Sequence, residues 1–366
     1  MTKIEQLLEK YCPEGVEFKS IEKVVNILDN QRKPISKGSR QSWKYPYYGA
    51  NGIQDYVDDY IFNGTFLLLG EDGSVINKDG SPVLNWAIGK IWVNNHAHVL
   101  SEKSEEALLR YIYFALSEID VTKVVKGNIP KITQQDLKNF QIPVPPIEIQ
   151  KEIVKILDTF TELEAELEAE LEARKKQYEY YRDDLLSFGD DEVEWRPLEK
   201  IYKFQYWKGN TIPTIWGEYL VYGSNGIVGT HNEYNSEDSP VIGHIGAYAG
   251  IVNWGKWKHF VTYNGVICRL IAEDVNPKYA YYQLLKQDFN SMAKNEAQPF
   301  VSYAALNNVL IPVPSKEKQE EIVETLDKFD ALVNDIFIGL PAELQARRQQ
   351  YEYYRNKLLT FEPLEK

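Results

Sequence analysis

Basic and aromatic side chains are interleaved in a stretch close to the N-terminus. Residues 30–54 hold five Lys or Arg residues and no Asp or Glu, together with Trp43 and three tyrosines. Lys and Arg bind phosphate groups, whereas Arg, Asn and Gln can hydrogen-bond to base edges. Comparable clusters in the second half are YWKGN from Tyr206, WGKWKHF from Trp254 and QPFVSY from Gln298. These residue types predict nucleic-acid contacts from loops in both halves of the chain.

The candidate contact residues form two sets, one in each half. The first set is Arg32, Lys33, Lys37, Arg40, Lys44, Tyr48, Asn51, Lys126, Asn128 and Lys131. The second set is Lys208, Asn210, Tyr222, Ser224, Asn225, His244, Tyr248, Lys256, Lys258, Gln298, Ser302 and Tyr303. A solvated basic loop on an unrelated surface is the alternative for any one cluster, and recurrence in both halves argues against it.

One segment resembles a phosphate loop, but the match is incomplete. GIVNWGKW, from Gly250, fits G-x-x-x-x-G-K up to Lys256. Trp257 then stands where Ser or Thr should bind Mg²⁺, and no helix is expected to follow. The sequence also contains no N-P-P-Y motif for amino methylation and no G-x-S-x-G nucleophile elbow. We predict a non-catalytic chain without a cofactor; an ATP-using enzyme relying on Lys256 is a minor alternative.

The Cys and His residues do not predict a metal site. Cys12 and Cys268 are far apart and lack ligand-like spacing, which fits a reducing compartment. His96 and His98 would share one face of a strand, but two ligands do not make a metal site. No apolar run approaches the length of a membrane span, so we expect a cytoplasmic protein.

The segments that must position these clusters are duplicated. RKKQYEYYRDDLLSF from Arg174 returns as RRQQYEYYRNKLLTF from Arg347, and YGANGI from Tyr48 returns as YGSNGI from Tyr222. A repeat of this kind predicts a duplicated structural unit.

Each half is predicted to be a mixed segment followed by a long helix. Short apolar runs between Gly, Asn and Asp turns indicate strands. The expected parts are an N-terminal helix at 1–15, mixed domains at 16–145 and 189–314, and helices at 146–188 and 315–366. The predicted fold class is α+β: two similar mixed α/β domains separated by an antiparallel pair of long coiled-coil-like helices, with a pseudo-twofold internal repeat. Residues 3–11 are expected to pack near residues 350–361.

Apolar residues at steps of three and four predict a coiled-coil-like stripe on each long helix. The residues expected to pack are Phe160, Leu163, Leu167, Leu171, Tyr178, Tyr181, Leu185, Phe329, Ile336, Leu340, Leu344, Tyr351, Tyr354 and Leu358. A lone helix would leave its stripe in water, so the two helices are expected to cover each other. Gly339 and Pro341 are expected to kink the second helix. Packing of the stripes against an ordinary core is the alternative.

A tetrapeptide repeat in the first helix could set a distance. LEAELEAELEA begins at Leu163, and one unit more or less changes the helix length by about 6 Å, close to one or two base pairs. A net charge of −13 is unusual for a DNA-binding protein, because phosphate contacts need Lys and Arg. Residues 142–188, however, hold 12 acidic and 6 basic side chains, so much of the acidity belongs to this helix.

Together these motifs resemble those of the specificity subunit of type I restriction-modification systems, over essentially the whole chain. The resemblance rests on the IPVP segments, the QxEIVxxLDxF segments from Gln150 and Gln319, and the two QYEYYR segments. It implies two target recognition domains that read the halves of a bipartite double-stranded DNA site. It also implies helices that set the gap between half-sites and bind two modification subunits, with restriction subunits joining for cleavage. Methyl donor and ATP would belong to those partners.

The two halves of the spacer are not equal in length, because the second helix is four residues longer around GLPAEL from Gly339. The alternative function is a coiled-coil scaffold with two protein-binding domains. A scaffold would leave no footprint on DNA, whereas a DNA-binding subunit should bind DNA less tightly as the salt concentration rises.

Overall fold

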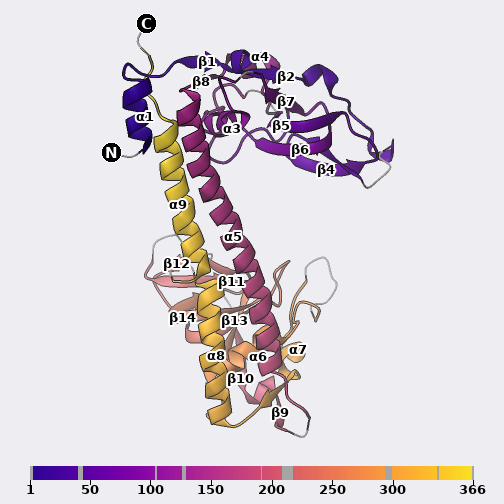
Figure 1. Ribbon diagram of the computed structural model, residues 1–366. Coiled ribbons are helices and arrows are strands. Elements are labelled where there is room, and N and C mark those ends of the chain that lie inside the picture. The colour runs from indigo at the N-terminus through magenta and orange to yellow at the C-terminus, as the bar shows by residue number, and fades with distance from the viewer. Residues whose placement is uncertain are drawn as a thin grey trace. The chain divides into compact units, whose positions relative to one another are not determined.

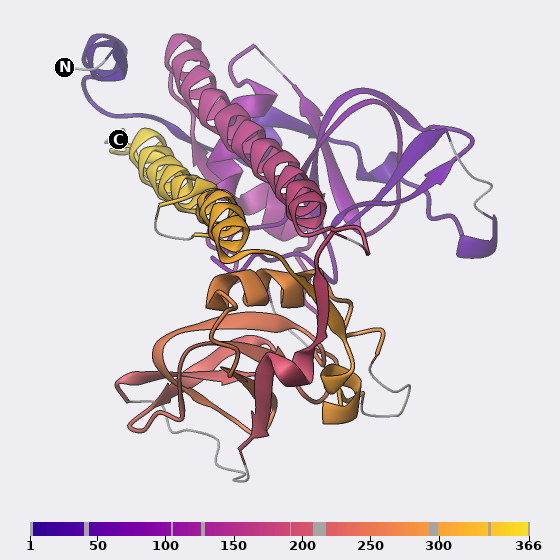
Figure 2. The ribbon, with the colours of Figure 1, turned by 90° about the horizontal axis from the view of Figure 1, so that it is seen from below.

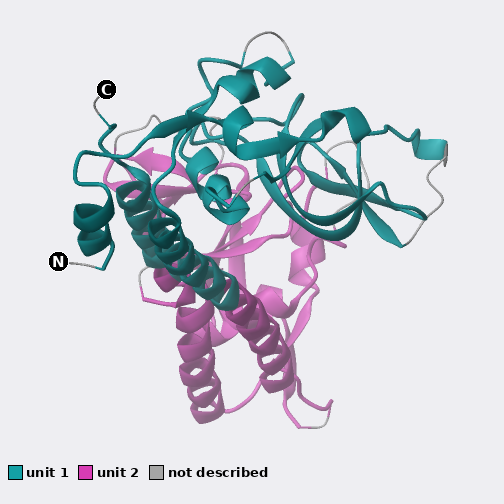
Figure 3. Cartoon of the chain, turned by 45° about the horizontal axis from the view of Figure 1, so that its top comes forward, with its two compact units in different colours: residues 1–167, 344–366 teal, residues 168–343 magenta. Residues whose placement is uncertain are grey.

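The computed structural model describes residues 3–39, 44–103, 105–125, 129–190, 192–207, 217–292, 299–335 and 338–364 (Figure 1). The chain divides into two compact units (Figure 3). Unit 1 contains residues 1–167 and 344–366, and unit 2 contains residues 168–343. No helix in the described ranges has the length and apolar character needed to cross a membrane.

Unit 1 is built on a six-stranded mixed sheet of order β2-β7-β5-β6-β3-β4. Its strands are β1 Phe18–Ser20, β2 Val25–Ile27, β3 Tyr45–Gly49, β4 Gly52–Val57, β5 Phe62–Gly70, β6 Leu84–Val93, β7 Ala97–Glu102 and β8 Gln141–Pro143. Its shorter helices are α1 Lys3–Tyr11, α2 Ile21–Val24, α3 Leu109–Ser117 and α4 Gln134–Asn139, with 3₁₀ turns η1 Asp29–Gln31 and η2 Lys37–Ser39. Strands β3 and β6 are parallel, and the other neighbouring pairs are antiparallel.

Unit 2 repeats this sheet in the order β10-β15-β13-β14-β11-β12. Its strands are β9 Glu194–Pro197, β10 Tyr202–Tyr206, β11 Tyr219–Gly223, β12 Gly226–His231, β13 Ser236–Gly243, β14 Val252–Val261, β15 Gly265–Leu270 and β16 Leu310–Val313. Its shorter helices are α6 Pro277–Lys286 and α7 Tyr303–Asn307, with the 3₁₀ turn η3 Leu198–Lys200. Each strand has a counterpart at the same place in the order, including one parallel pair, β11 with β14.

Each central strand is buried on both faces, which explains its continuous apolar sequence. In β5, Leu67 and Leu69 belong to the large core with α3, whereas Phe66 and Leu68 belong to a smaller core on the opposite face. Unit 2 has the same arrangement, and α6 contacts both β14 and α8 (Figure 2). The sheets are therefore rigid frames that position loops at their ends.

The long helix α5 spans Ile147–Leu185 and contributes residues to both units. In unit 1 it packs against α9, Leu340–Leu359. The Phe160 ring stacks on Tyr354 at 5.6 Å, and Glu164 pairs with Arg348 at 2.6 Å. Because residue numbers rise along α5 as they fall along α9, the helices are antiparallel.

In unit 2 the last part of α5 packs against α8, Lys316–Asn334, where Tyr181 stacks on Phe329 at 5.8 Å. Strand β9 follows α5, strand β16 precedes α8, and these two strands pair with each other. The end of α5 therefore lies beside the start of α8, and these helices are also antiparallel.

The second long helix is not one kinked helix as expected. Helix α8 ends at Asn334 and α9 begins at Leu340, so Pro341 lies in the first turn of a new helix, where its missing N–H breaks no hydrogen bond. Gly339 donates its N–H to the Asp335 carbonyl at this junction. Ile336 lies outside the described residues.

The predicted stripe is only partly buried. Tyr178 and Leu344 are buried, and Leu171, Leu185, Tyr351 and Leu358 pack on the cores of their units. Leu163 is 41% exposed, and the fully buried Leu157 and Leu186 were not among the expected packing residues. Residues 161–173 of α5, which include the tetrapeptide repeat, are mostly exposed.

The N-terminal segment lies against the end of the chain within unit 1. Val16 accepts a hydrogen bond from Leu364 N–H and donates its own N–H to the Glu362 carbonyl, both at 2.9 Å. Ile4 of α1 is buried in the same core as Leu359 of α9. Residues at the two ends of the described chain thus share one core.

Candidate nucleic-acid interface

Two matching turns present polar side chains at one end of each sheet. The turn between β3 and β4 holds Asn51, and the turn between β11 and β12 holds Asn225; both side chains are exposed. Gly52 and Gly226 have φ angles of +89° and +79°, a region that glycine enters without a steric penalty. The shared Asn-Gly sequence is therefore required by the turns, which leave the asparagines facing solvent.

Three predicted contact residues instead support these turns. Tyr48 and Tyr222 are 9% and 5% exposed, and burial raises the pKa of both phenols. The Ser224 hydroxyl lies 2.8 Å from both the Ile245 and Asn264 carbonyls. These three side chains therefore hold the turns in place, and Ser224 also lines the pocket beside the β11–β12 turn; their contacts with DNA stay predictions.

Arg32 also has an internal role. Its Nη1 donates to the Glu71 carboxylate at 2.6 Å and to the Ala97 carbonyl at 2.7 Å, and its side chain is 12% exposed. If this guanidinium turned to a phosphate, Glu71 would lose its shortest ion pair and keep only the longer one with Lys131 at 3.3 Å. Arg32 therefore makes a structural ion pair in this structure, and its contact with phosphate stays a prediction.

Arg32 belongs to a buried polar network in which Asp29 is the central acceptor. Asp29 accepts hydrogen bonds from His98 Nδ1 at 2.6 Å, from Val99 N–H and from the Gln134 amide, both at 3.0 Å. Burial alone would raise the pKa of Asp29, but the hydrogen bond and charge of His98, with the other two donors, hold it below its usual range.

This network contains three groups with metal-ligand chemistry. Ligand atoms of Asp29, Glu71 and His98 lie within 4.8 Å of one another. Arg32 already pairs with both carboxylates, and His98 Nε2 donates to the Ile132 carbonyl at 2.9 Å. Because Arg32, His98 and Lys131 already pair with these carboxylates, we assign the network to the support of the sheet.

The remaining described lysines of the first set reach solvent. Lys33, Lys37 and Lys44 are exposed. The loop that carries Lys33 is fixed to the sheet, because the Lys33 carbonyl accepts a hydrogen bond from Trp92 Nε1 at 2.6 Å. Lys131 pairs with Glu71 at 3.3 Å but stays half exposed. These lysines can meet phosphates without disturbing a core.

Six predicted contact residues lie outside the described residues. They are Arg40, Lys126, Asn128, Lys208, Asn210 and Gln298.

In unit 2 an aromatic stack occupies the place of the ionic network. The rings of Tyr206 and Tyr303 stack at 3.8 Å and 9°, and His244 lies 4.1 Å from Tyr206. His244 Nδ1 donates to the Val301 carbonyl at 2.9 Å, and the Ser302 hydroxyl caps α7. Burial lowers the pKa of His244 and raises that of Tyr303 to about 12. His244, Ser302 and Tyr303 thus make internal contacts as well, and their contacts with DNA stay predictions.

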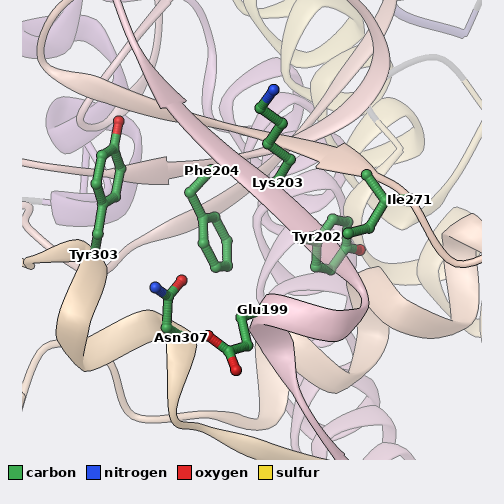
Figure 4. A pocket seen from close by; sticks show the side chains of 7 residues that line it. All are labelled: Glu199, Tyr202, Lys203, Phe204, Ile271, Tyr303 and Asn307. Atoms are coloured by element: carbon green, nitrogen blue, oxygen red, sulfur yellow. The ribbon is translucent and has the colours of Figure 1, made fainter.

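The exposed candidates of unit 2 are Tyr248, Lys256 and Lys258. Tyr248 and Asn225 line a pocket of about 460 Å³ beside the β11–β12 turn, together with Asn264. A second pocket, of about 300 Å³, lies against β10, with Phe204, Tyr303 and Asn307 around it (Figure 4). The first pocket adjoins exposed amide groups and is the better place for a base edge.

Comparison with known proteins now bears on this arrangement of two matched sheets. A family described as "Type I restriction modification DNA specificity domain" matches residues 13–173 and again residues 196–346. The chain belongs to the type I restriction-modification specificity family. The predicted family and the two-domain α+β fold class are therefore confirmed, and the role of the family is specificity rather than catalysis.

Relatives in the specificity family extend over nearly the whole chain. A putative type I restriction enzyme specificity subunit of Haemophilus influenzae is 36% identical and covers 98% of both chains. The Type I restriction enzyme EcoR124I/EcoR124II specificity subunit of Escherichia coli is 33% identical over 94% of this chain and 98% of its own.

Solved structures share the fold. The S subunit of a type I restriction-modification system from M. genitalium aligns with a TM-score of 0.67 at 18% identity, over 94% of this chain and 96% of its own. A chain from a structure concerned with complex assembly and conformational transition of the type I R-M system aligns with a TM-score of 0.56 at 15% identity, over 95% and 98%.

Two exposed residues of this specificity-family chain, Lys90 and Trp257, were not among the contact residues predicted from the sequence. Both are exposed on the matching strands β6 and β14. An alignment of the two halves that starts at YGANGI and YGSNGI and continues into the later strands would have matched Lys90 with Lys258. These lysines occupy the fifth position of WAIGKIW and of WGKWKHF.

Proposed function

We propose that this chain is the non-catalytic DNA-specificity subunit of a type I restriction-modification complex, in which each six-stranded sheet reads one half of a bipartite double-stranded site. One observation carries the proposal: two sheets of identical strand order present different side chains at matching positions. A protein that reads two different half-sites needs the same docking frame twice, with different exposed residues on each.

The long helices are proposed to bind two modification subunits. In the repeated QYEYYR segments, Tyr180 and Tyr353 stand at matching positions and are 68% and 62% exposed. Exposed aromatic residues suit protein interfaces, whose centres are rich in tyrosine. Restriction subunits would join this assembly, and methyl donor and ATP would be bound by the partners. This function requires access to cellular DNA and places the protein in the cytoplasm.

The deciding experiment is methylome sequencing of cells that express the chain with its modification subunits. We expect adenine methylation at one split sequence, and DNA affinity that falls steeply as salt rises because bound counterions are released. Modification subunits alone are the control. Methylation without sequence preference in the presence of the chain would contradict the proposal, and absence of any DNA footprint would favour a protein-binding scaffold.

Deletion of one tetrapeptide unit, residues 163–166, tests the role of α5. Removing four residues shortens a helix by about 6 Å, so the gap between half-sites should change by one or two base pairs while both half-sequences persist. The methylome of the deletion variant, compared with wild type, measures the gap directly. An unchanged gap would show that α5 does not set the spacing.

A further inference from the structure

The two sheets share a lysine that lies over a pair of tyrosines. In unit 1, Lys90 Nζ lies 4.6 Å from the centre of the Tyr60 ring, which packs at 5.1 Å on Tyr45. In unit 2, Lys258 Nζ lies 4.8 Å from the Tyr234 ring, which packs at 5.2 Å on Tyr219. The interplanar angles of the tyrosine pairs, 62° and 56°, also agree.

These two arrangements stand at the same place in the two frames. Lys90 and Lys258 lie on β6 and β14, Tyr45 and Tyr219 begin β3 and β11, and each lysine is exposed. A lysine held over an aromatic face keeps its charge in a defined position with its ammonium open to solvent.

The residue before each lysine differs sharply between the units. Gly89 precedes Lys90 with a φ of +84°, and a side chain there would meet no atom within 4 Å. Trp257 precedes Lys258 with a φ of +51° and is 72% exposed. A bulky residue rarely adopts positive φ, so unit 2 holds a tryptophan where unit 1 uses the residue that suits the backbone.

The strained position of Trp257 is held by its neighbours. Its N–H donates to the Asp238 carboxylate at 2.7 Å, and Asp238 itself has a φ of +35°. The register of β13 against β14 shifts between Glu237 and Ser239, which places a bulge at this point. Within the described part of the chain, no aromatic ring is found packed on the Trp257 indole. The fold thus presents this ring to solvent at a conformational cost.

The shared and the differing residues suit different parts of DNA. Contacts that position a protein on the backbone carry no sequence information and can be the same in both domains, whereas base contacts must differ. Lysine supplies the first kind of contact. An exposed aromatic ring supplies the second, because it can stack on a base or enter a base step, and Lys256 beside it adds a further positive charge.

We propose that Lys90 and Lys258 bind a backbone phosphate at the same point of their respective half-sites, and that Trp257 contacts the bases beside that phosphate in the half-site read by unit 2. This assignment rests on the proposed function and adds the residues that divide positioning from readout. Unit 1 has Gly89 at the position of Trp257, so only the half-site read by unit 2 receives the aromatic contact.

The test uses the full chain assembled with its modification subunits, and a duplex that carries the site found by methylome sequencing. A second duplex has the unit 2 half-site scrambled. Trp257→Gly copies unit 1, and Trp257→Asn is a second variant that tolerates positive φ. Both should keep the melting temperature of the wild type, yet reduce discrimination between the duplexes by about tenfold or more. Ile271→Ala, which changes an exposed apolar residue of unit 2, is the matched control.

Lys258→Ala and Lys90→Ala should weaken binding to both duplexes alike and lower the salt slope of log Kd by about 1 each. Lys203→Ala, an exposed lysine on β10, should change neither quantity. Undiminished discrimination in both folded Trp257 variants would overturn the readout role, and unchanged salt slopes would overturn the phosphate role. A wild-type complex that does not distinguish the duplexes would overturn the proposed function itself.

Discussion

The carbonyl groups of Ile132 in unit 1 and Val301 in unit 2 occupy matching positions, yet different histidines bind them. In unit 1 the donor is His98 from the middle of the sheet, and in unit 2 it is His244 from the end of β13. The Ile132 N–H donates to the Glu71 carbonyl, and the Val301 N–H donates to the His244 carbonyl. Glu71 and His244 directly follow the central strands β5 and β13. The same backbone junction is thus held by two unrelated sets of side chains.

The difference extends to the surrounding residues. Asp29 follows β2 by two residues and accepts bonds from His98 and Gln134, whereas Tyr206 ends β10 and stacks on Tyr303. Gln134 and Tyr303 both begin the short helix that follows the junction. An ionic network depends on every member, because one loss leaves a buried charge uncompensated, whereas an aromatic stack loses contact area gradually. Unit 1 should therefore be the more brittle of the two.

The largest expected effect comes from Asp29→Ala. It removes the acceptor shared by His98, Val99 N–H and Gln134 and should destabilise unit 1 by about 3 kcal/mol. Hydrogen exchange should show reduced protection in β7 while β15 keeps its own. Asp29→Asn preserves the shape of the side chain, so the stability of this variant is expected to lie between those of the wild type and Asp29→Ala. Equal loss of protection in both strands would mean that the network does not act locally.

Tyr206→Ala gives the corresponding test in unit 2, with a smaller effect. Loss of the ring contacts with Tyr303 and His244 should cost about 2 kcal/mol, since Tyr206 is only half-buried. Protection should fall in β15 and not in β7. Tyr206→Phe keeps the stack and should be nearly neutral, because the hydroxyl makes only a 3.4 Å contact with the Val301 carbonyl. A large loss in Tyr206→Phe would shift the explanation from stacking to the hydroxyl.

The smallest expected effect is a difference in pH dependence. Burial lowers the pKa of His244 and of His259, so these rings bind a proton less readily in the folded chain than in the unfolded chain, where a histidine gains a proton near about pH 6.5. Unit 2 should therefore lose stability as the pH falls below that value. Asp29, with a lowered pKa, contributes stability that is present above about pH 4 and is lost in stronger acid.

Urea unfolding followed by hydrogen exchange between pH 7 and pH 5 measures this contrast. His244→Gln and His259→Gln, made together, should flatten the slope in β15. A slope that survives this double substitution would exclude the two rings as its source.

The sequence predicted the features that depend on local patterns. The Asn-Gly repeat at Asn51 and Asn225 marks the two matching turns, and helical spacing placed Phe160 and Tyr354 on the stripes of two helices expected to cover each other; the structure shows these two rings in contact. The break before α9 was misjudged because Pro341 is equally compatible with a kink and with a first turn.

Other features depend on contacts between distant residues. From the sequence alone, Arg32 was predicted to bind phosphate. Its ion-pair partner, Glu71, is 39 residues away, and only the folded sheet brings the two side chains together. In the sequence, Trp257 was noted only as a mismatch to the phosphate-loop pattern. Its positive φ angle cannot be deduced from the residue type. Leu163 has the spacing of a packing residue but lies in a part of α5 that is mostly exposed.

The exposed LEAE segment of α5 has a consequence for where nucleic acid can go. Glu162 and Glu166 project into water, whereas Glu164 pairs with Arg348 and Glu170 pairs with Arg174. A polyanion brought close to this surface is repelled, and the repulsion reaches about 8 Å at physiological ionic strength. If the proposed function holds, we expect the exposed acidic side chains of this segment to discourage unspecific adsorption of DNA along the helix, which leaves that surface available to proteins.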